Sequence, residues 1–183
     1  MRKADIADIA KIADIVAGQM QSGSRENKNI EYNSKQQATV SSESISLALA
    51  KRIAAKVEQK AAEIGVNAVI SICGAGARPV LTECMDDSYI ASFDIAFNKA
   101  FTSVSLKMST VKLKSLSQPH GSLYGIQNTN DGKIVVFGGG EPLLYGGRII
   151  GGLGVSGGSE EQDTLLAKFG AECAKAELSK FGE

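Results

Sequence analysis

The order of hydrophobic and polar positions divides the 183-residue chain into three parts. In residues 1–20, apolar side chains recur at every third or fourth position, which is the pattern of one face of an amphipathic helix. Residues 21–41 are mostly polar and have no periodic apolar pattern, so they are predicted to form a linker. From residue 42 to residue 183, helical and strand-like patterns alternate, and this part is predicted to form one domain.

Within this domain the pattern predicts helices and two hairpins. A first helix runs from about residue 42 to Gly65, with Ser41 or Ser42 as its N-cap, and strands at 67–73 and 79–85 form a hairpin. Asp87 or Ser88 caps a second helix, and a third helix covers residues 109–116. Strands at 133–137 and 147–156 form the second hairpin, and Ser159 caps the last helix. The predicted core stripe of the second helix is Ile90, Phe93, Phe97, Ala100, Phe101 and Val104. This order favours an α+β fold with a central antiparallel sheet flanked by helices.

The composition argues against several classes of protein but does not identify a function. Lys and Arg total 20 and so do Asp and Glu, which argues against a nucleic-acid-binding protein with a basic surface. No apolar run approaches the roughly 20 residues that a membrane-spanning helix needs, so no membrane contact is expected. The three cysteines form no CxxC pair, and Asp5, Asp8 and Asp14 interrupt the first residues where a secretory signal would be apolar. A cytoplasmic location is therefore expected.

Glycines are concentrated in the last third of the chain, in the segment FGGGEPLLYGGRIIGGLGVSGGSEEQD at residues 137–163. This segment resembles the GlcG/HbpS-like family, which includes the C-terminal domain of PduO-type corrinoid adenosyltransferases. Two further matches lie upstream, at CMDD (84–87) and at Ser92, Ala96, Lys99 and Ala100 in the second predicted helix. The resemblance covers nearly all of the predicted domain.

The resemblance implies a profilin-like α+β fold and a homo-oligomer. It also implies a small-ligand-binding or cofactor-binding role, since some members bind haem and others accompany coenzyme B12-dependent diol breakdown. Haem and a corrinoid (cobalamin-type) ligand are both expected candidates. Adenosyltransferase activity is not implied, because it belongs to a separate helical domain.

Several side chains are candidates for ligand contacts. His120 is the chain's only histidine, and it is either an axial ligand to the metal of a cofactor or an ordinary loop residue. Tyr124, Tyr145, Met85 and Met108 are weaker metal-ligand candidates. Lys99 either anchors a propionate or phosphate or extends to solvent. Gly138, Gly139 and Gly140, followed by Glu141, either form the floor of a cofactor site or serve tight turns and close packing.

Three functional hypotheses remain open. The first is a cofactor binder without catalytic activity, since no catalytic motif is present. The second is an enzyme that acts on a small organic acid or aldehyde through Lys99 and Asp163, and the third is a purely structural oligomer. The N-terminal helix either packs on its own domain or targets the chain to a bacterial microcompartment. In the latter case it would dock on a shell or cargo protein through Ile6, Ile9, Ile12 and Val16.

Overall fold

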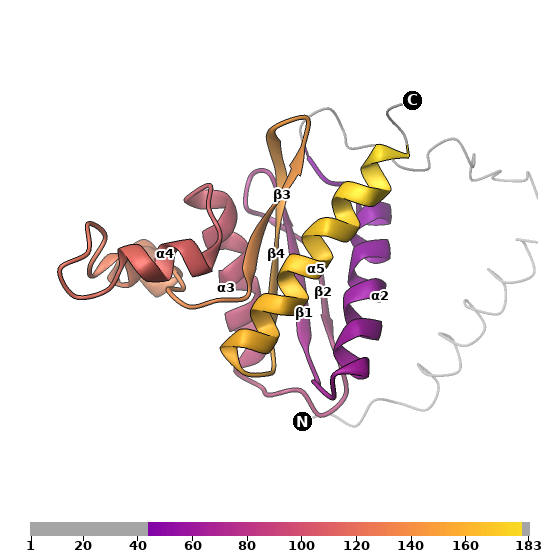
Figure 1. Cartoon of the computed structure of the whole chain (residues 1–183), viewed down its shortest axis with the longest axis horizontal. Helices are drawn as coiled ribbons and strands as arrows, with labels where there is room; N and C mark the ends of the chain where they lie inside the picture. The colour runs from indigo at the N-terminus through magenta and orange to yellow at the C-terminus, as the bar shows by residue number, and fades with distance from the viewer. Residues whose placement is uncertain (1–43, 181–183) are drawn as a thin grey trace, which may run out of the picture. The chain divides into compact units, whose positions relative to one another are not determined.

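The computed structural model describes residues 44–180 and contains a four-stranded antiparallel sheet between helices (Figure 1). The strand order is β2-β1-β4-β3. Helices α2 and α5 cover one face of the sheet and α3 covers the other, while α4 and the segments around it extend away from the sheet (Figure 1). The elements are α2 (Leu47–Glu63), β1 (Val69–Gly74), β2 (Pro79–Cys84), α3 (Ser92–Ser105), α4 (Thr110–Leu116), η2 (Ile126–Asn128), η3 (Asn130–Gly132), β3 (Gly140–Tyr145), β4 (Arg148–Ser156) and α5 (Glu160–Ser179). The predicted α+β class is confirmed.

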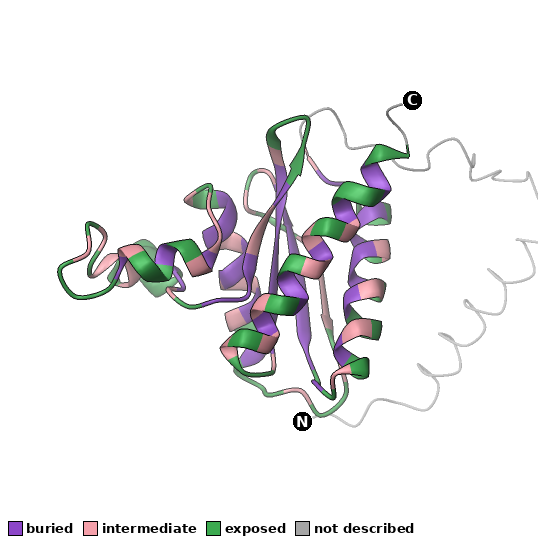
Figure 2. Cartoon of the chain, viewed as in Figure 1, coloured by how far each residue is buried: buried purple, intermediate pink, exposed green. Residues whose placement is uncertain are grey.

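The main core lies between the sheet and the pair α2 and α5. Leu49, Ile53 and Val57 of α2 are buried there, as predicted, and they pack with Ile72 and Leu153 of the central strands. In Figure 2 the buried residues form bands along the strands and along the sides of the two helices that face them. Burying side chains of this size stabilises the fold by about 1.5–3 kcal/mol each. No helix in residues 44–180 is long and apolar enough to cross a membrane.

The first helix begins later than predicted. Its N-cap is Ser46, whose side chain accepts a hydrogen bond from the Leu49 N–H. The reason is that Ile45 is held at the sheet, where its N–H donates to the Ile150 carbonyl oxygen at 2.8 Å. The predicted N-caps Ser41 and Ser42 lie outside the described residues, as do the N-terminal helix and its linker.

The first hairpin is confirmed, whereas one strand of the second was placed wrongly. Residues 133–137 form no strand, although Ile134 and Val135 are buried. This segment runs beside α3 instead, where Thr102 Oγ1 accepts from the Val135 N–H (3.0 Å) and donates to the Lys133 carbonyl oxygen (3.3 Å). The strand that forms the second hairpin with β4 is β3. The turn between them is Gly146-Gly147, with φ values of +54° and +77°. Two left-handed residues in a two-residue loop are typical of a type I′ hairpin.

The buried face of α3 also differs from the prediction. Ile90 is 97% exposed and Phe93 is 53% exposed, so neither belongs to the core. The helix instead presents small or polar residues to β4, because Gly152 and Gly154 allow the two backbones to approach closely. A Cβ atom at Gly152 would lie 2.5 Å from the carbonyl oxygen of Ala100. The buried residues of α3 are Ser92, Ala96, Lys99, Ala100, Thr102, Ser103 and Val104.

The predicted N-cap of α3 is wrong, whereas that of α5 is confirmed. Asp87 and Ser88 do not cap α3, which begins at Ser92 after Ala91, a residue without a side-chain capping bond. Ser159 does cap α5, where its side chain and that of Gln162 form a reciprocal capping box. The cap starts α5 shortly after β4 ends at Ser156.

Candidate functional site

A buried ion pair lies where α3, the end of β4 and the start of α5 meet. The ammonium group of Lys99 donates to the Asp163 carboxylate (Nζ–Oδ2 2.7 Å) and to the carbonyl oxygen of Val155 (2.8 Å). The centre of the Phe137 ring lies 4.9 Å from the same nitrogen, within the range of a cation–π contact. Burial lowers the pKa of Lys99, and the nearby Asp163 carboxylate opposes that shift. Lys99 is fully buried, so its charge is held by protein groups and links α3 to α5.

The glycine segment passes directly over this ion pair. A Cβ atom at Gly139 would lie 2.7 Å from the Lys99 Nζ, and one at Gly140 would lie 2.6 Å from the Lys99 carbonyl oxygen. The Gly139 carbonyl oxygen accepts from the Val155 N–H at 2.8 Å. The structure therefore brings Lys99 and the predicted glycines together, and close packing explains why Gly139 and Gly140 carry no side chain. Ligand contact by these residues stays a prediction.

Gly138 has a different neighbourhood. Its N–H donates to the Glu160 carboxylate at 2.9 Å. A Cβ atom there would collide with Thr164 Oγ1 and would lie 3.1 Å from a methyl group of Val111. These neighbours all line a hollow of about 540 Å³ between α4 and α5, called here the α4–α5 groove: Val111, Lys114, Glu160, Glu161, Thr164, Leu165 and Lys168. Gly138 therefore packs against residues that line the groove, and a side chain at this position would displace Thr164.

The α4–α5 groove combines an apolar wall with charged rims. Leu165 is 48% exposed and faces the hollow together with Val111. Lys114 donates to Glu160 at 2.6 Å, and this bond is the main reason that the pKa of Glu160 is lowered. Lys168 is exposed on the α5 side. Such a surface can hold a flat apolar molecule that carries acidic groups.

His120 and Tyr124 lie together on the loop that follows α4. The Gly121 N–H donates to the Gln118 carbonyl oxygen at 2.8 Å, which closes a turn with Pro119 and His120 at its centre. His120 has a φ of +70°, a left-handed conformation that glycine adopts more easily. Both His120 and Tyr124 are exposed. The loop presents two side chains that can bind a metal, and neither is used in the core.

Glu141 lies on β3 and borders another hollow of about 490 Å³, between the β3–β4 turn and the C-terminal half of α5. Burial raises the pKa of Glu141, and the positive charge of Lys168 opposes this. Tyr145 lines the same hollow. The structure therefore places Glu141 apart from the α4–α5 groove but within the electrostatic influence of Lys168, one of the groove's residues.

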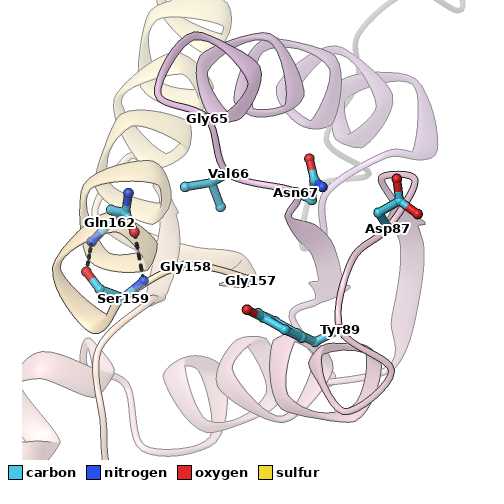
Figure 3. A pocket seen from close by; sticks show the side chains of 9 residues that line it. All are labelled: Gly65, Val66, Asn67, Asp87, Tyr89, Gly157, Gly158, Ser159 and Gln162. Carbon is cyan, nitrogen blue, oxygen red and sulfur yellow. Dashed lines mark hydrogen bonds between the residues drawn. The ribbon is translucent and has the colours of Figure 1, made fainter.

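Two adjoining hollows surround the turn between β4 and α5. One, of about 490 Å³, is lined by residues that include Asn67, Asp87 and Tyr89, and Figure 3 shows the Tyr89 side chain extending toward Gly157. The other, of about 290 Å³, is lined by Ser92, Ile95, Phe137, Ser156 and Asp163 among others. Both are bordered by Tyr89, Gly157 and Gly158. The smaller hollow lies directly against the ion pair through Asp163.

Sequence reasoning missed the partners that define these sites. It did not identify Ser156 and Phe137 as site residues, it named Ser92 only as part of the family motif, and it did not pair Asp163 with Lys99. The available signal was the spacing of Ser92, Ala96, Lys99 and Ser103, which places small or polar residues on one side of α3. Within residues 44–180, no three His, Cys, Asp or Glu side chains are grouped to hold a metal ion.

Several known proteins are similar to this chain in sequence and in structure. A family model described as a haem-degrading, HbpS-like protein matches residues 45–172. A 15.0 kDa protein from the dhaT-dhaS intergenic region of Citrobacter freundii is 46% identical over 129 residues, which cover 70% of this chain and 91% of that relative. A solved structure of a PduOC:heme complex is 35% identical with a TM-score of 0.69, and the match covers 71% of this chain and 94% of that one.

One further relative is much longer. The corrinoid adenosyltransferase PduO of Citrobacter freundii is 43% identical over 109 residues, but these cover 60% of this chain and only 32% of PduO. The chain therefore spans about a third of PduO, and the similarity does not transfer the activity of the whole enzyme.

Proposed function

This chain belongs to the HbpS-like family, and we propose on that premise that it binds haem. The observation that carries the proposal is the similarity to the PduOC:heme complex, which extends over 94% of that chain. A haem-binding role also fits the absence of a metal cluster made from side chains in residues 44–180, because the porphyrin itself supplies most of the iron ligands. Corrinoid binding, for which the same shape and chemistry would serve, is the alternative that the experiment below separates.

The α4–α5 groove is the proposed binding surface. Its volume of about 540 Å³ lies within the range of small-ligand pockets. Val111 and Leu165 would pack against the porphyrin face, and Lys114 and Lys168 would pair with its two propionates. Gly138 leaves room for the groove residues Thr164 and Val111, and Lys99 acts indirectly through its bonds to Asp163 of α5 and Val155 of β4.

His120 is the residue that would bind the haem iron. The Gln118 side chain donates to the carbonyl oxygen of Lys114 at 2.9 Å, so the turn that carries His120 is attached to the α4 wall of the groove. A histidine held at a φ of +70° is unfavourable by roughly 1 kcal/mol relative to glycine, and such strain is often retained where a side chain has a function. Tyr124, on the same loop, is the second candidate ligand.

The test is titration of the full chain with haem, followed by the Soret absorbance band. We expect a saturable shift in the wild type and loss of the axial-ligand spectrum in His120→Gly, a substitution that removes the imidazole and relieves the backbone strain. Asn130→Gly is the matched control, since Asn130 also has a left-handed φ (+52°) in the following loop. Lys114→Gln with Lys168→Gln should weaken affinity at least tenfold.

Three results would contradict the proposal. Absence of a saturable haem shift would refute haem binding, and an unchanged spectrum in His120→Gly would refute the assigned ligand and direct the search to Tyr124→Phe. A parallel titration with cobalamin that saturates at lower concentration than haem would favour the corrinoid alternative. These readouts are spectroscopic, so none depends on a catalytic assay.

Assembly and targeting are further parts of the proposal. The groove is open to solvent, and a second copy of the chain in a homo-oligomer would cover a bound haem. Residues 1–20, with Ile6, Ile9, Ile12 and Val16, would direct the chain to a shell or cargo protein of a bacterial microcompartment. Fusing residues 1–20 to a fluorescent protein tests this, because diffuse fluorescence in cells that make microcompartments would refute targeting.

A further inference from the structure

A pair of buried hydroxyl groups faces the smaller hollow at the end of β4. Ser92 is 3% exposed and Ser156 is 5% exposed, and the Ser156 hydroxyl donates to Ser92 Oγ at 3.0 Å. Two hydroxyls carry two protons, and the bond between them uses one. In residues 44–180, no protein acceptor takes the remaining proton. A buried donor without an acceptor is costly, so this proton favours an oxygen atom supplied from the hollow.

The hollow has the dimensions and walls of a site for a small molecule. Its volume is about 290 Å³, roughly that of several water molecules. Ile95 and Phe137 supply apolar walls, while Tyr89, Gly157 and Gly158 form the border shared with the larger hollow. Figure 3 shows the Tyr89 side chain directed toward Gly157 at this border. The lining of the hollow therefore combines apolar and polar groups.

The charges around the hollow favour an uncharged ligand. Lys99 is the nearest buried cation, but two of its three N–H groups are bonded to Asp163 and Val155, and Phe137 lies beside the ammonium group. The positive charge of Lys99 is therefore already stabilised by groups of the protein. Glu160, which also lines the hollow, is paired with Lys114. None of the residues that line this hollow is a cation, and a carboxylate ligand would face the carboxylates of Asp163 and Glu160.

Glu160 adds a hydrogen-bond acceptor at the rim. Its two carboxylate oxygens accept from Lys114 Nζ (2.6 Å) and from the Gly138 N–H (2.9 Å). Each oxygen has a second lone pair, so Glu160 can also accept from a ligand hydroxyl. The hollow therefore offers a donor at the serine pair and an acceptor at Glu160, with apolar walls between. A hydroxyl group is both an acceptor and a donor, and it matches this arrangement.

We propose that the hollow lined by Ser92, Ser156 and Glu160 is a second binding site, which takes a small uncharged alcohol. The ligand oxygen accepts from the serine pair, its hydroxyl donates to Glu160, and its carbon atoms lie against Ile95 and Phe137. The Lys99–Asp163 ion pair forms the rigid base of the site and makes no bond with the ligand. The serine pair and the apolar walls of this site are not part of the α4–α5 groove, whereas Glu160 lines both hollows.

The experiment compares three probes that each have four heavy atoms: 2-propanol, acetone and acetate. The full chain is labelled with ¹⁵N, and the amide signals of Ser156, Gly157 and Gly158 are followed by NMR during titration. We expect saturable shifts with 2-propanol, at least tenfold weaker binding of acetate, and intermediate binding of acetone, which can accept but not donate. Non-saturating shifts with 2-propanol, or acetate binding as tightly as 2-propanol, would overturn the proposal.

Variants identify the residues responsible. Ser92→Ala with Ser156→Ala should weaken 2-propanol binding at least tenfold, and Ser105→Ala, an exposed serine at the end of α3, is the control that should leave it unchanged. If the double variant does not fold, Ala91→Phe serves instead, because exposed Ala91 lines the hollow and a large side chain there would block it. Unchanged binding in the folded double variant, or in Ala91→Phe, would refute the site.

Discussion

Replacing Lys99 with methionine tests the central feature of the structure, the buried ion pair. The substitution keeps most of the side-chain volume but removes the hydrogen bonds from Nζ to Asp163 (2.7 Å) and to the Val155 carbonyl oxygen (2.8 Å). Asp163, which is only 4% exposed, then keeps its bond from the Gly158 N–H but has no cation nearby in the core. Breaking a buried ion pair in this way costs about 3–5 kcal/mol of unfolding free energy.

Urea unfolding at pH 7 measures this cost, with Lys112→Met as the control because Lys112 is exposed. We expect the control to change stability by less than about 0.5 kcal/mol.

A double-mutant cycle separates the pair from its surroundings. Lys99→Met combined with Asp163→Asn should cost at least about 2 kcal/mol less than the sum of the single variants, because the second change removes the unpaired charge. A cost for Lys99→Met of less than about 1 kcal/mol would show that the ammonium group is not buried and paired as described.

Three further predictions concern packing, acid stability and cysteine reactivity. Gly154→Ala should cost about 3 kcal/mol or more in urea unfolding, because its Cβ would overlap the Ala96 carbonyl oxygen, whereas Gly76→Ala has open space and should be nearly neutral. The hydrogen bond from Lys56 is the main reason that the pKa of Glu177 is lowered from 4.5 to about 2. The charged carboxylate of Glu177 therefore stabilises the folded protein above about pH 4.5, and this stabilisation is lost as the pH falls towards 2. Glu177→Gln should therefore lower the thermal midpoint at pH 7 and flatten its decline between pH 4.5 and 2; an unchanged acid profile would contradict this. Burial raises the pKa of Cys73 to about 11, so a thiol reagent at pH 8 should modify exposed Cys84 quickly and Cys73 only after unfolding; rapid modification of Cys73 in the folded protein would be the contrary result.

Local patterns were reliable where a segment's own residues decide its structure. The α2 stripe, the first hairpin and the Ser159 cap of α5 all depend on contacts between residues near one another in sequence or on simple amphipathic periodicity. The glycine-dense segment also sufficed to identify the family, which the family model at residues 45–172 confirms. Prediction was weaker where an apolar run could form either a strand or a buried irregular segment. Residues 133–137 are such a run, and they lie beside α3 and are not paired in the sheet.

The sequence by itself therefore determined the α+β class, most helices and strands and the family, because these follow from periodicity, capping residues and a long motif. Only the tertiary structure decided which residues meet. Lys99 and Asp163 are 64 positions apart, and no local pattern encodes their contact. The glycines of β4 also shift the expected face of α3. Ala100 and Val104 of the predicted stripe are buried as expected, but the close approach also buries Lys99, and Ile90 and Phe93 are exposed. Close packing between distant segments, rather than hydrophobicity along one segment, sets the position of both proposed sites.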